Sequence, residues 1–152
     1  VAGLSWPLRG HRASFVTVTV DGALRGCIGS PAPVRPLAVD VAHNAARAAS
    51  ADPRFARMTD AEAGRAEASI SVLSMPRAID CDCEEALVAA LEPGRDGLIL
   101  RAGSRAGLFL PQVWKQLPHA GDFVRHLKAK AGIGEDEWPA GMRAERFSTE
   151  SF

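Results

Sequence analysis

The sequence predicts an α+β fold with a largely antiparallel β-sheet flanked by helices. Two observations predict this class: two segments have the pattern of β-hairpins, and helical segments lie between the strands without the regular strand–helix alternation of a parallel sheet. A length of 152 residues suits one compact domain. We expect a single domain over residues 14–152, after an irregular lead-in over residues 1–13.

The first hairpin has the clearest local pattern. Ser14 to Val20 alternates β-branched residues and is typical of a strand. Asp21-Gly22 follows, a pair that favours the positive φ angles of a tight turn, and Ala23 to Gly29 forms the returning strand. A two-residue turn would pair Val18 with Arg25 and Val16 with Cys27, so both residues would share a face with valines.

The later elements follow from periodicity, caps and turns. An apolar stripe predicts a helix from Leu37 to about Ala51, and the Asp52-Pro53 turn ends it. Thr59 and Glu62 have the spacing of a capping box that opens a short helix. The remaining expected elements are strands over 66–73, 98–101, 108–110 and 142–147, helices over 84–91 and 122–130, one helical turn over 113–116, and a short helix or turn over 135–138.

Composition excludes several classes of protein. The chain has 18 basic and 18 acidic residues and is 47% hydrophobic, which argues against a disordered chain, a charged tail or nucleic-acid binding driven by net charge. Three cysteines are too few for a disulfide scaffold and favour a reducing, cytoplasmic location. We expect no membrane association, because no apolar run approaches about 20 residues and no signal segment opens the chain. Only three basic residues are lysines, which, with the many alanines, suggests a GC-rich bacterial source.

The neutral total hides an uneven charge distribution. Residues 1–57 carry seven arginines against three aspartates, a net charge of +4. Residues 58–92 carry a net charge of −6, and residues 93–152 a net charge of +2. The positive first third also contains the two segments considered next, Leu24–Gly29 and Asp52–Phe55.

Leu24-Arg25-Gly26-Cys27-Ile28-Gly29 is the motif with the most chemical potential. Arg25 and Cys27 lie two apart on a strand and share a face, and a nearby guanidinium stabilises a thiolate. Gly26 and Gly29 would allow a ligand or another backbone to approach closely. The alternative is that Cys27 packs as a small apolar residue. Both interpretations stay open, and Asp52 is a candidate partner for the Arg25 guanidinium.

Asp52-Pro53-Arg54-Phe55 is a second candidate segment. It places two opposite charges and an aromatic ring on a rigid turn, which could line a cleft beside the hairpin. The alternative is a turn closed by Asp52 with an ordinary surface ion pair.

Other chemical signatures are sparse. Cys81 and Cys83, and likewise His119 and His126, lack the ligand number and spacing of a zinc site, so we expect no metal. The sequence contains no phosphate-binding loop, no nucleophile elbow and no HExxH motif. No cofactor can be assigned from these residues.

The motifs resemble those of the AMMECR domain family, whose bacterial members are called AmmeMemoRadiSam system protein A. The resemblance runs from about Ser14 to Phe152 and includes SFVTVTVDGALRGCIGS, RPLAVDVAHNAARAASADPRF, ASISVLSMP, GRDGLIL, GLFLPQV and DFVRHLKAKAGI with Trp138. It implies an α+β fold of two closely packed lobes, a site at Leu24–Gly29, and partnership with a Memo-type protein and a radical SAM enzyme. The family's helix before the first strand is expected to be absent here or replaced by Val1–Arg12.

Two functional hypotheses follow. In the first, the chain is an enzyme or enzyme subunit with Cys27 as nucleophile or thiol carrier and Arg25 as the group that orients an anion. The residues expected to bind substrate are Gly26, Gly29, Ser30, Asp52, Arg54, Phe55 and Ser71. In the second, the chain is a non-catalytic module that binds a protein or peptide of the same system at this hairpin. Nucleic-acid binding through the arginine-rich first third is the weakest hypothesis.

Overall fold

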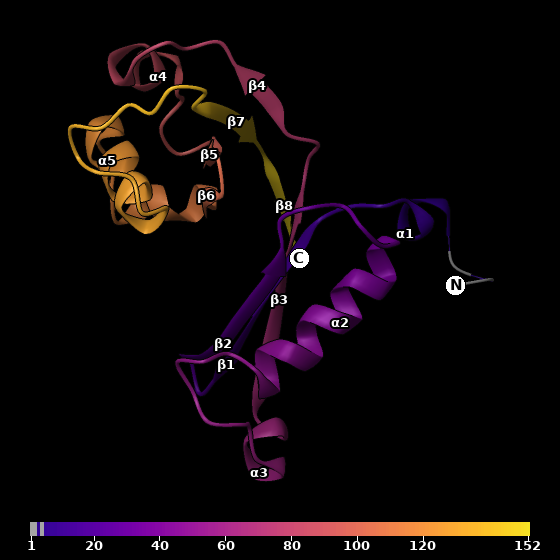
Figure 1. The fold of residues 1–152 in the computed structure, drawn as a ribbon. Coiled ribbons are helices and arrows are strands. Elements are labelled where there is room, and N and C mark those ends of the chain that lie inside the picture. The colour runs from indigo at the N-terminus through magenta and orange to yellow at the C-terminus, as the bar shows by residue number, and fades with distance from the viewer. Residues whose placement is uncertain (1–2, 4) are drawn as a thin grey trace. The chain divides into compact units, whose positions relative to one another are not determined.

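The computed structural model describes residue 3 and residues 5–152, and it confirms the α+β class (Figure 1). The chain divides into two compact units. Unit 1 contains the chain up to Ser74 together with Glu150–Phe152, and unit 2 contains Met75–Thr149. Each unit has one four-stranded sheet, so two sheets stand where the sequence suggested one.

The sheet of unit 1 has the strand order β2-β1-β3-β8. Its members are β1 (Ser14–Val20), β2 (Ala23–Ser30), β3 (Ala66–Leu73) and β8 (Thr149–Ser151). The sequence predicted the first three strands and missed β8. This last strand is short and polar, and Phe152 and Ile70 exchange backbone hydrogen bonds of 2.9 and 3.0 Å beside it. Residues 149–152 thus complete a sheet that begins with the first hairpin.

The hairpin turn is the one the sequence predicted. Asp21 has a φ of 51° and Gly22 a φ of 81°, and Val20 lies opposite Ala23. An aspartate followed by glycine adopts these positive φ angles at low cost, which is why this pair closes the strands tightly.

A β-bulge changes the register just beyond the turn. Arg25 is the extra residue, so Val18 lies opposite Gly26 and Thr17 lies opposite Cys27. The expected pairs of Val18 with Arg25 and Val16 with Cys27 are therefore wrong. One inserted residue moves every later β2 side chain to the other face of the sheet, because side chains alternate with a period of two.

Helix α2 (Leu37–Ser50) covers one face of this sheet. Val16 and Val18 pack against Ala48 of α2 in a fully apolar cluster. Gly26 permits this close approach, because a Cβ atom at that position would lie 1.9 Å from the carbonyl oxygen of Ala48. The absence of a side chain at Gly26 therefore sets how tightly α2 packs on β2.

Two short helices complete unit 1. Helix α1 (Trp6–Arg9) lies in the segment expected to be irregular, and proline in its first turn suits a helix start. Expectations for residues 1, 2 and 4 lie outside the described residues. Helix α3 (Asp60–Ala63) opens with the predicted capping box, in which Thr59 and Glu62 each bond the other's backbone N–H.

Unit 2 has the strand order β4-β7-β5-β6, with helices against the sheet. The sequence predicted all of its elements except β4, which has only three residues. The elements are β4 (Arg77–Ile79), α4 (Glu84–Ala90), β5 (Gly97–Ala102), β6 (Arg105–Phe109), the 3-10 helix η1 (Pro111–Lys115), α5 (Ala120–Lys130) and β7 (Arg143–Phe147). The strand expected to close the fold, β7, lies inside the sheet between β4 and β5.

The core of unit 2 joins its sheet to α4 and α5. Leu98 and Leu100 of β5 are fully buried with Leu87 of α4 and Phe123 of α5. Trp114 stacks on Phe123 with ring centroids 3.8 Å apart. This apolar cluster explains why the helices of unit 2 form where the sequence periodicity places them. Within the described part of the chain, no helix has the length and apolar character needed to cross a membrane.

Candidate functional site

Cys27 lies on the face of the unit 1 sheet opposite α2. The register places Cys27, Thr17 and Ser69 in one row across β2, β1 and β3. The Cys27 side chain is half-buried, and the Thr17 hydroxyl donates a hydrogen bond of 3.4 Å to its sulfur. The bulge at Arg25 is what turns the thiol away from the apolar α2 face and toward this polar row.

The backbone of Cys27 is held by Asp52. Strand β2 is the edge of its sheet, and the outward N–H of Cys27 donates to Asp52 Oδ2 at 2.9 Å. Asp52 is 4% exposed and also accepts bonds from the Arg54 backbone (3.0 Å), Nε (3.0 Å) and Nη2 (2.7 Å). The hydrogen bonds from the Arg54 side chain are the main reason why the pKa of Asp52 lies well below its usual range. Asp52 is therefore an ionised anchor at neutral pH.

The Arg54 side chain bonds Asp52 and is also exposed to solvent. Its side chain is 55% exposed, and among the described residues its Nη1 has no hydrogen-bond acceptor. The hydrogen bond with Asp52 is the largest of the causes that raise the pKa of Arg54, and a negative charge on Cys27 is the smallest. The sulfur of Cys27 is thus within electrostatic reach of a guanidinium that keeps one edge open.

Arg25 is engaged on every side and does not contact Asp52, so the expected Arg25–Asp52 pair is wrong. Its Nε and Nη2 bond the two carboxylate oxygens of Glu62 at 2.9 and 3.2 Å, and its Nη1 bonds the carbonyl of Ala56 at 2.8 Å. The side chain is only 16% exposed. The Arg25 bonds, aided by the capping bonds to Thr59, lower the pKa of Glu62 to about 2.

Phe55 connects the two arginines. The guanidinium carbons of Arg25 and Arg54 lie 5.8 and 5.5 Å from the centroid of its ring. Both distances are within the range of cation–π attraction. The turn at residues 52–55 is closed by Asp52, which accepts the Arg54 N–H and pairs with the Arg54 guanidinium, as in the second of the two alternatives given for this segment. It also contacts β2, because Asp52 bonds the backbone of Cys27 and the Phe55 ring lies beside Arg25.

The other expected site residues divide between the two faces. Gly26 and Ser30 belong to the α2 side, and the space beside Gly26 is filled by a backbone, one of the two partners expected for it. Gly29 lies against the Phe15 ring, where a Cβ atom would approach to 2.1 Å. Ser71 lies opposite Phe15, one row away from Cys27. Of the expected site residues outside β2, Asp52 bonds the Cys27 backbone and Arg54 interacts with Cys27 electrostatically.

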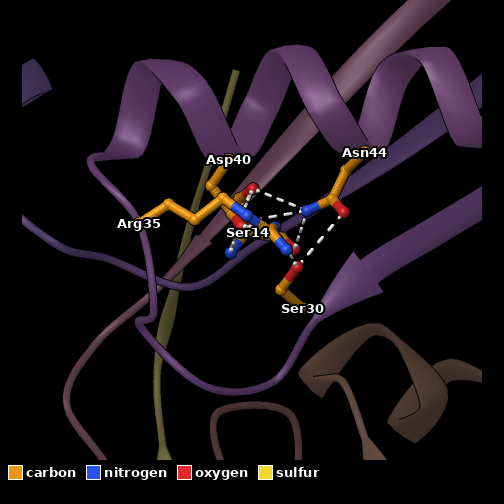
Figure 2. Close-up of polar contacts among 5 residues, drawn as sticks. All are labelled: Ser14, Ser30, Arg35, Asp40 and Asn44. Atoms are coloured by element: carbon orange, nitrogen blue, oxygen red, sulfur yellow. Dashed lines mark hydrogen bonds and ion pairs between the residues drawn. The ribbon is translucent and has the colours of Figure 1, made fainter.

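Ser30 belongs to a buried polar network at the start of α2 (Figure 2). Asp40, fully buried, accepts bonds from the Ser14 backbone N–H (3.1 Å), the Ser14 hydroxyl (2.7 Å), Asn44 (3.0 Å) and Arg35 (2.8 Å). The Ser30 hydroxyl donates to the Asn44 side-chain oxygen at 3.2 Å. The hydrogen-bonding groups of these residues are paired with one another, so the network fixes α2 to β1 and β2 and does not face a ligand.

The structure gives Cys81 and Cys83 no thiol pairing: all three cysteines are free. Burial is the main cause that raises the pKa of the Cys81 thiol, followed by the nearby negative charge of Asp80. Among the described residues, no three His, Cys, Asp or Glu side chains gather as a metal-binding group.

Sequence reasoning missed three contributors to the site. Thr17 lies beside Cys27, and Ser69 lies beyond Thr17 in the same row, only because the bulge shifts the register. The carboxylate of Glu62, 37 residues further along the chain in α3, accepts hydrogen bonds from Arg25. The sequence identified Glu62 as a capping residue, but its pairing with Arg25 depends on the fold. A glycine-rich returning strand is the one sequence signal that could have suggested a bulge.

Comparison with known proteins gives consistent matches along the chain. The model of the AMMECR1 family matches residues 4–152. Protein MK0488 of Methanopyrus kandleri is 39% identical over 135 residues, covering 84% of this chain and 63% of that protein. A protein of Thermofilum pendens is 41% identical over 135 residues, covering 85% of this chain and 62% of its own length. The chain thus spans slightly less than two thirds of these two relatives.

A solved structure has the same fold. The crystal structure of the uncharacterized protein PH0010 from Pyrococcus horikoshii matches 99% of this chain and 77% of its own chain, with a TM-score of 0.90 and 31% identity. These relatives are archaeal, which does not fit the bacterial source suggested by composition. The match of the family model over almost the entire chain, together with the same fold in a relative, leads to one conclusion: the chain belongs to the AMMECR1 family.

Proposed function

We propose that this protein is an enzyme or enzyme subunit in which Cys27 acts as a nucleophile or thiol carrier. The observation that carries the proposal is the sharing of Asp52: one buried carboxylate fixes both the Cys27 backbone and the Arg54 guanidinium. A half-buried thiol and an open cationic edge are thereby held side by side. The arrangement suits an electrophile that also carries an anionic group.

The roles of the two arginines are exchanged relative to the sequence-based hypothesis. Arg54 keeps Nη1 open to solvent, so it is the group that would orient a carboxylate or phosphate. Arg25 is saturated by Glu62 and Ala56 and acts as a positioning residue that holds the bulge. In the chemical step, the Cys27 thiol gives its proton to water, its sulfur forms a bond to the electrophilic carbon, and the leaving group departs with the electron pair of the broken bond.

The proposed partners come from the family resemblance. Members of AmmeMemoRadiSam systems resemble this chain, so we propose that it acts with a Memo-type protein and a radical SAM enzyme, one of which would supply or receive the group carried on Cys27.

Alkylation by two reagents that differ in charge tests the proposal. Iodoacetate carries a carboxylate and iodoacetamide does not, so the ratio of their rates at Cys27 measures attraction by Arg54. We expect Arg54→Gln to lower this ratio by roughly twofold to fivefold, in line with the energy of a partly exposed ion pair. Peptide mass spectrometry resolves Cys27 from Cys81 and Cys83.

Arg57→Gln is the matched control. Arg57 is an exposed arginine of the same loop and forms no ion pair among the described residues, so its removal should leave the ratio unchanged. An equal loss in both variants, or an unchanged ratio in Arg54→Gln, would refute the role of Arg54. A Cys27 that resists both reagents in the folded protein would refute the nucleophile.

A non-catalytic binding module is the second candidate. One observation favours it: in the described part of the chain, the hydrogen bonds of Cys27 go to Thr17 and Asp52, and no histidine contacts it as a general base. This candidate predicts that co-purification with a Memo-type protein survives Cys27→Ala but is lost in Arg54→Ala. Survival in both variants would contradict a role for this surface in binding.

A further inference from the structure

The outer edge of β2 carries backbone groups that the site described above does not use. Cys27 donates its outward N–H to Asp52, so the alternation along the strand also turns the N–H and the C=O of Gly29 away from β1. Neither group of Gly29 has a hydrogen-bond partner among the described residues, and Gly29 is only partly buried. Gly29 therefore presents one donor and one acceptor at an open sheet edge.

These two groups match one residue of an added antiparallel strand. In the hydrogen-bonded pairs of an antiparallel ladder, each residue donates its N–H to the C=O of the other. A strand that pairs with Gly29 in this way runs toward Cys27, because β2 itself runs from Ala23 to Ser30. The Asp52 carboxylate occupies the next position, since it accepts the Cys27 N–H that a further strand carbonyl would need. The added strand is therefore expected to end opposite Gly29.

The charge at this point suits a carboxyl terminus. Arg54 bonds Asp52 through Nε and Nη2, and its 55% exposed side chain leaves Nη1 open. Two residues of a strand span about 6.8 Å, so a carboxylate on the Gly29 N–H would lie about that far from the carboxylate of Asp52. One guanidinium with a hydrogen bond on each side can span this distance. A parallel strand would instead direct its amino-terminal end toward Arg54, where two positive charges would repel.

The Phe15 ring gives this position an apolar side. A Cβ atom on Gly29 would lie 2.1 Å from ring atoms of Phe15, so the ring covers Gly29 on the sheet face that also carries Cys27. The side chains of a directly paired couple of strand residues point to the same face. The last side chain of the added strand would therefore lie beside Phe15, where an apolar group removes ring surface from water.

We propose that the outer edge of β2 binds the carboxyl-terminal residue of a peptide with an apolar last side chain. The N–H of that residue donates to the Gly29 C=O, one carboxylate oxygen accepts the Gly29 N–H, and the other oxygen pairs with Arg54 Nη1. Because this binding mode rests on the anion-binding role proposed for Arg54, it names a substrate class for the Cys27 site: a peptide carboxyl terminus whose last side chain lies on the Cys27 face.

Calorimetry with the N-acetylated peptide AVAL and its C-terminal amide measures the preference for a carboxylate. The acid should bind the intact chain with a dissociation constant of about 1 mM or tighter. The amide should bind roughly twofold to fivefold more weakly, in line with the energy of a partly exposed ion pair. Arg54→Gln should remove this difference, and Arg57→Gln, the matched control, should retain it. Equal affinities of acid and amide for the unaltered chain, or a preference that survives Arg54→Gln, would overturn the proposal.

Methylation of single peptide nitrogens tests the strand pairing. An N-methyl group on the last residue removes the donor to the Gly29 C=O and should weaken binding about twofold to tenfold. An N-methyl group on the residue before it is the control, because that N–H points away from β2 in the alternating ladder. The affinity of the control peptide should match that of the unmethylated one, and an equal loss with both peptides would contradict the pairing with Gly29.

A Cys27→Ser variant separates this site from the nucleophile. The variant should keep the affinity and the carboxylate preference, because the thiol forms none of the three proposed bonds. If iodoacetamide labels Cys27 in a folded chain that shows no saturable peptide binding, the peptide site alone is wrong. If the acid binds with the expected preference while Cys27 stays unlabelled, the nucleophile is wrong and the peptide site stands.

Discussion

The two ends of α2 are attached to the sheet in the same way but leave different surfaces. At the start of the helix, Asp40 accepts the backbone N–H of Ser14 and pairs with Arg35. Just after its end, Asp52 accepts the backbone N–H of Cys27 and pairs with Arg54. Each aspartate thus joins a strand N–H to an arginine.

The difference lies in what surrounds each aspartate. Ser14 and Asn44 enclose Asp40, and its network is complete within the protein (Figure 2). Around Asp52, the thiol of Cys27 stays half-buried and Arg54 is more than half exposed. The same arrangement therefore encloses a polar network at one end of α2 and leaves a thiol and a guanidinium partly exposed at the other.

The largest expected effect is a difference in the free energy of unfolding that is lost when Asp40 or Asp52 is replaced. Asp40→Ala should lower the free energy of unfolding by about 3–5 kcal/mol, because it leaves the Arg35 charge and buried donors unpaired. Asp52→Ala should cost only about 1–3 kcal/mol, since Arg54 can turn to water. Urea denaturation measures both, with the exposed Asp136→Ala as control. Equal losses at the two aspartates would remove the proposed distinction.

The next effect tests how closely α2 packs beside the Cys27 strand. Gly26→Ala should destabilise the protein by about 1–3 kcal/mol, because the new Cβ would collide with the carbonyl oxygen of Ala48. Gly121→Ala is the matched control: a Cβ there meets nothing within 4 Å, and alanine in helix α5 should add up to about 1 kcal/mol. If both substitutions stabilise the protein, α2 does not constrain β2 as described.

A smaller effect concerns the stability of the fold at low pH. The pKa values of Asp52 and Glu62 are lower in the folded protein than in the unfolded chain, so their ionised forms stabilise the fold. This contribution should be complete above about pH 5 and decline as the pH falls below about 4 toward the folded pKa values. Denaturation measured between these conditions should show a shallower decline in Asp52→Asn, whose side chain does not ionise. An identical acid profile for this variant would contradict the anchoring role of Asp52.

Local signals predicted much of the fold. The Asp21-Gly22 turn, the capping box of Thr59 and Glu62, and the helix from Leu37 are determined by residues close together in the sequence, and the structure confirms them. Strands β4 and β8 were missed because each has three residues, too few for a periodic pattern, and forms only against a partner strand.

Four members of the candidate site were predictable from the sequence, but its geometry and its other members were not. Arg25, Cys27, Asp52 and Arg54 were identified from their motifs. The bulge at Arg25 reversed the expected face of Cys27, and Glu62 rather than Asp52 became the partner of Arg25. Pairings over such sequence separations depend on where β2, α3 and the turn meet in space, which no local pattern encodes.

The central claim is that Cys27 is a chemically accessible thiol, and the time course of iodoacetamide labelling in the folded protein tests it most directly. Peptide mass spectrometry would compare Cys27 with Cys81, whose neutral thiol is an internal reference. We predict that Cys27 reacts faster than Cys81, by roughly tenfold, because burial and the charge of Asp80 raise the pKa of Cys81 and keep it in the unreactive thiol form. If Cys27 is labelled only after unfolding, the thiol is a packing residue and the proposed function is wrong.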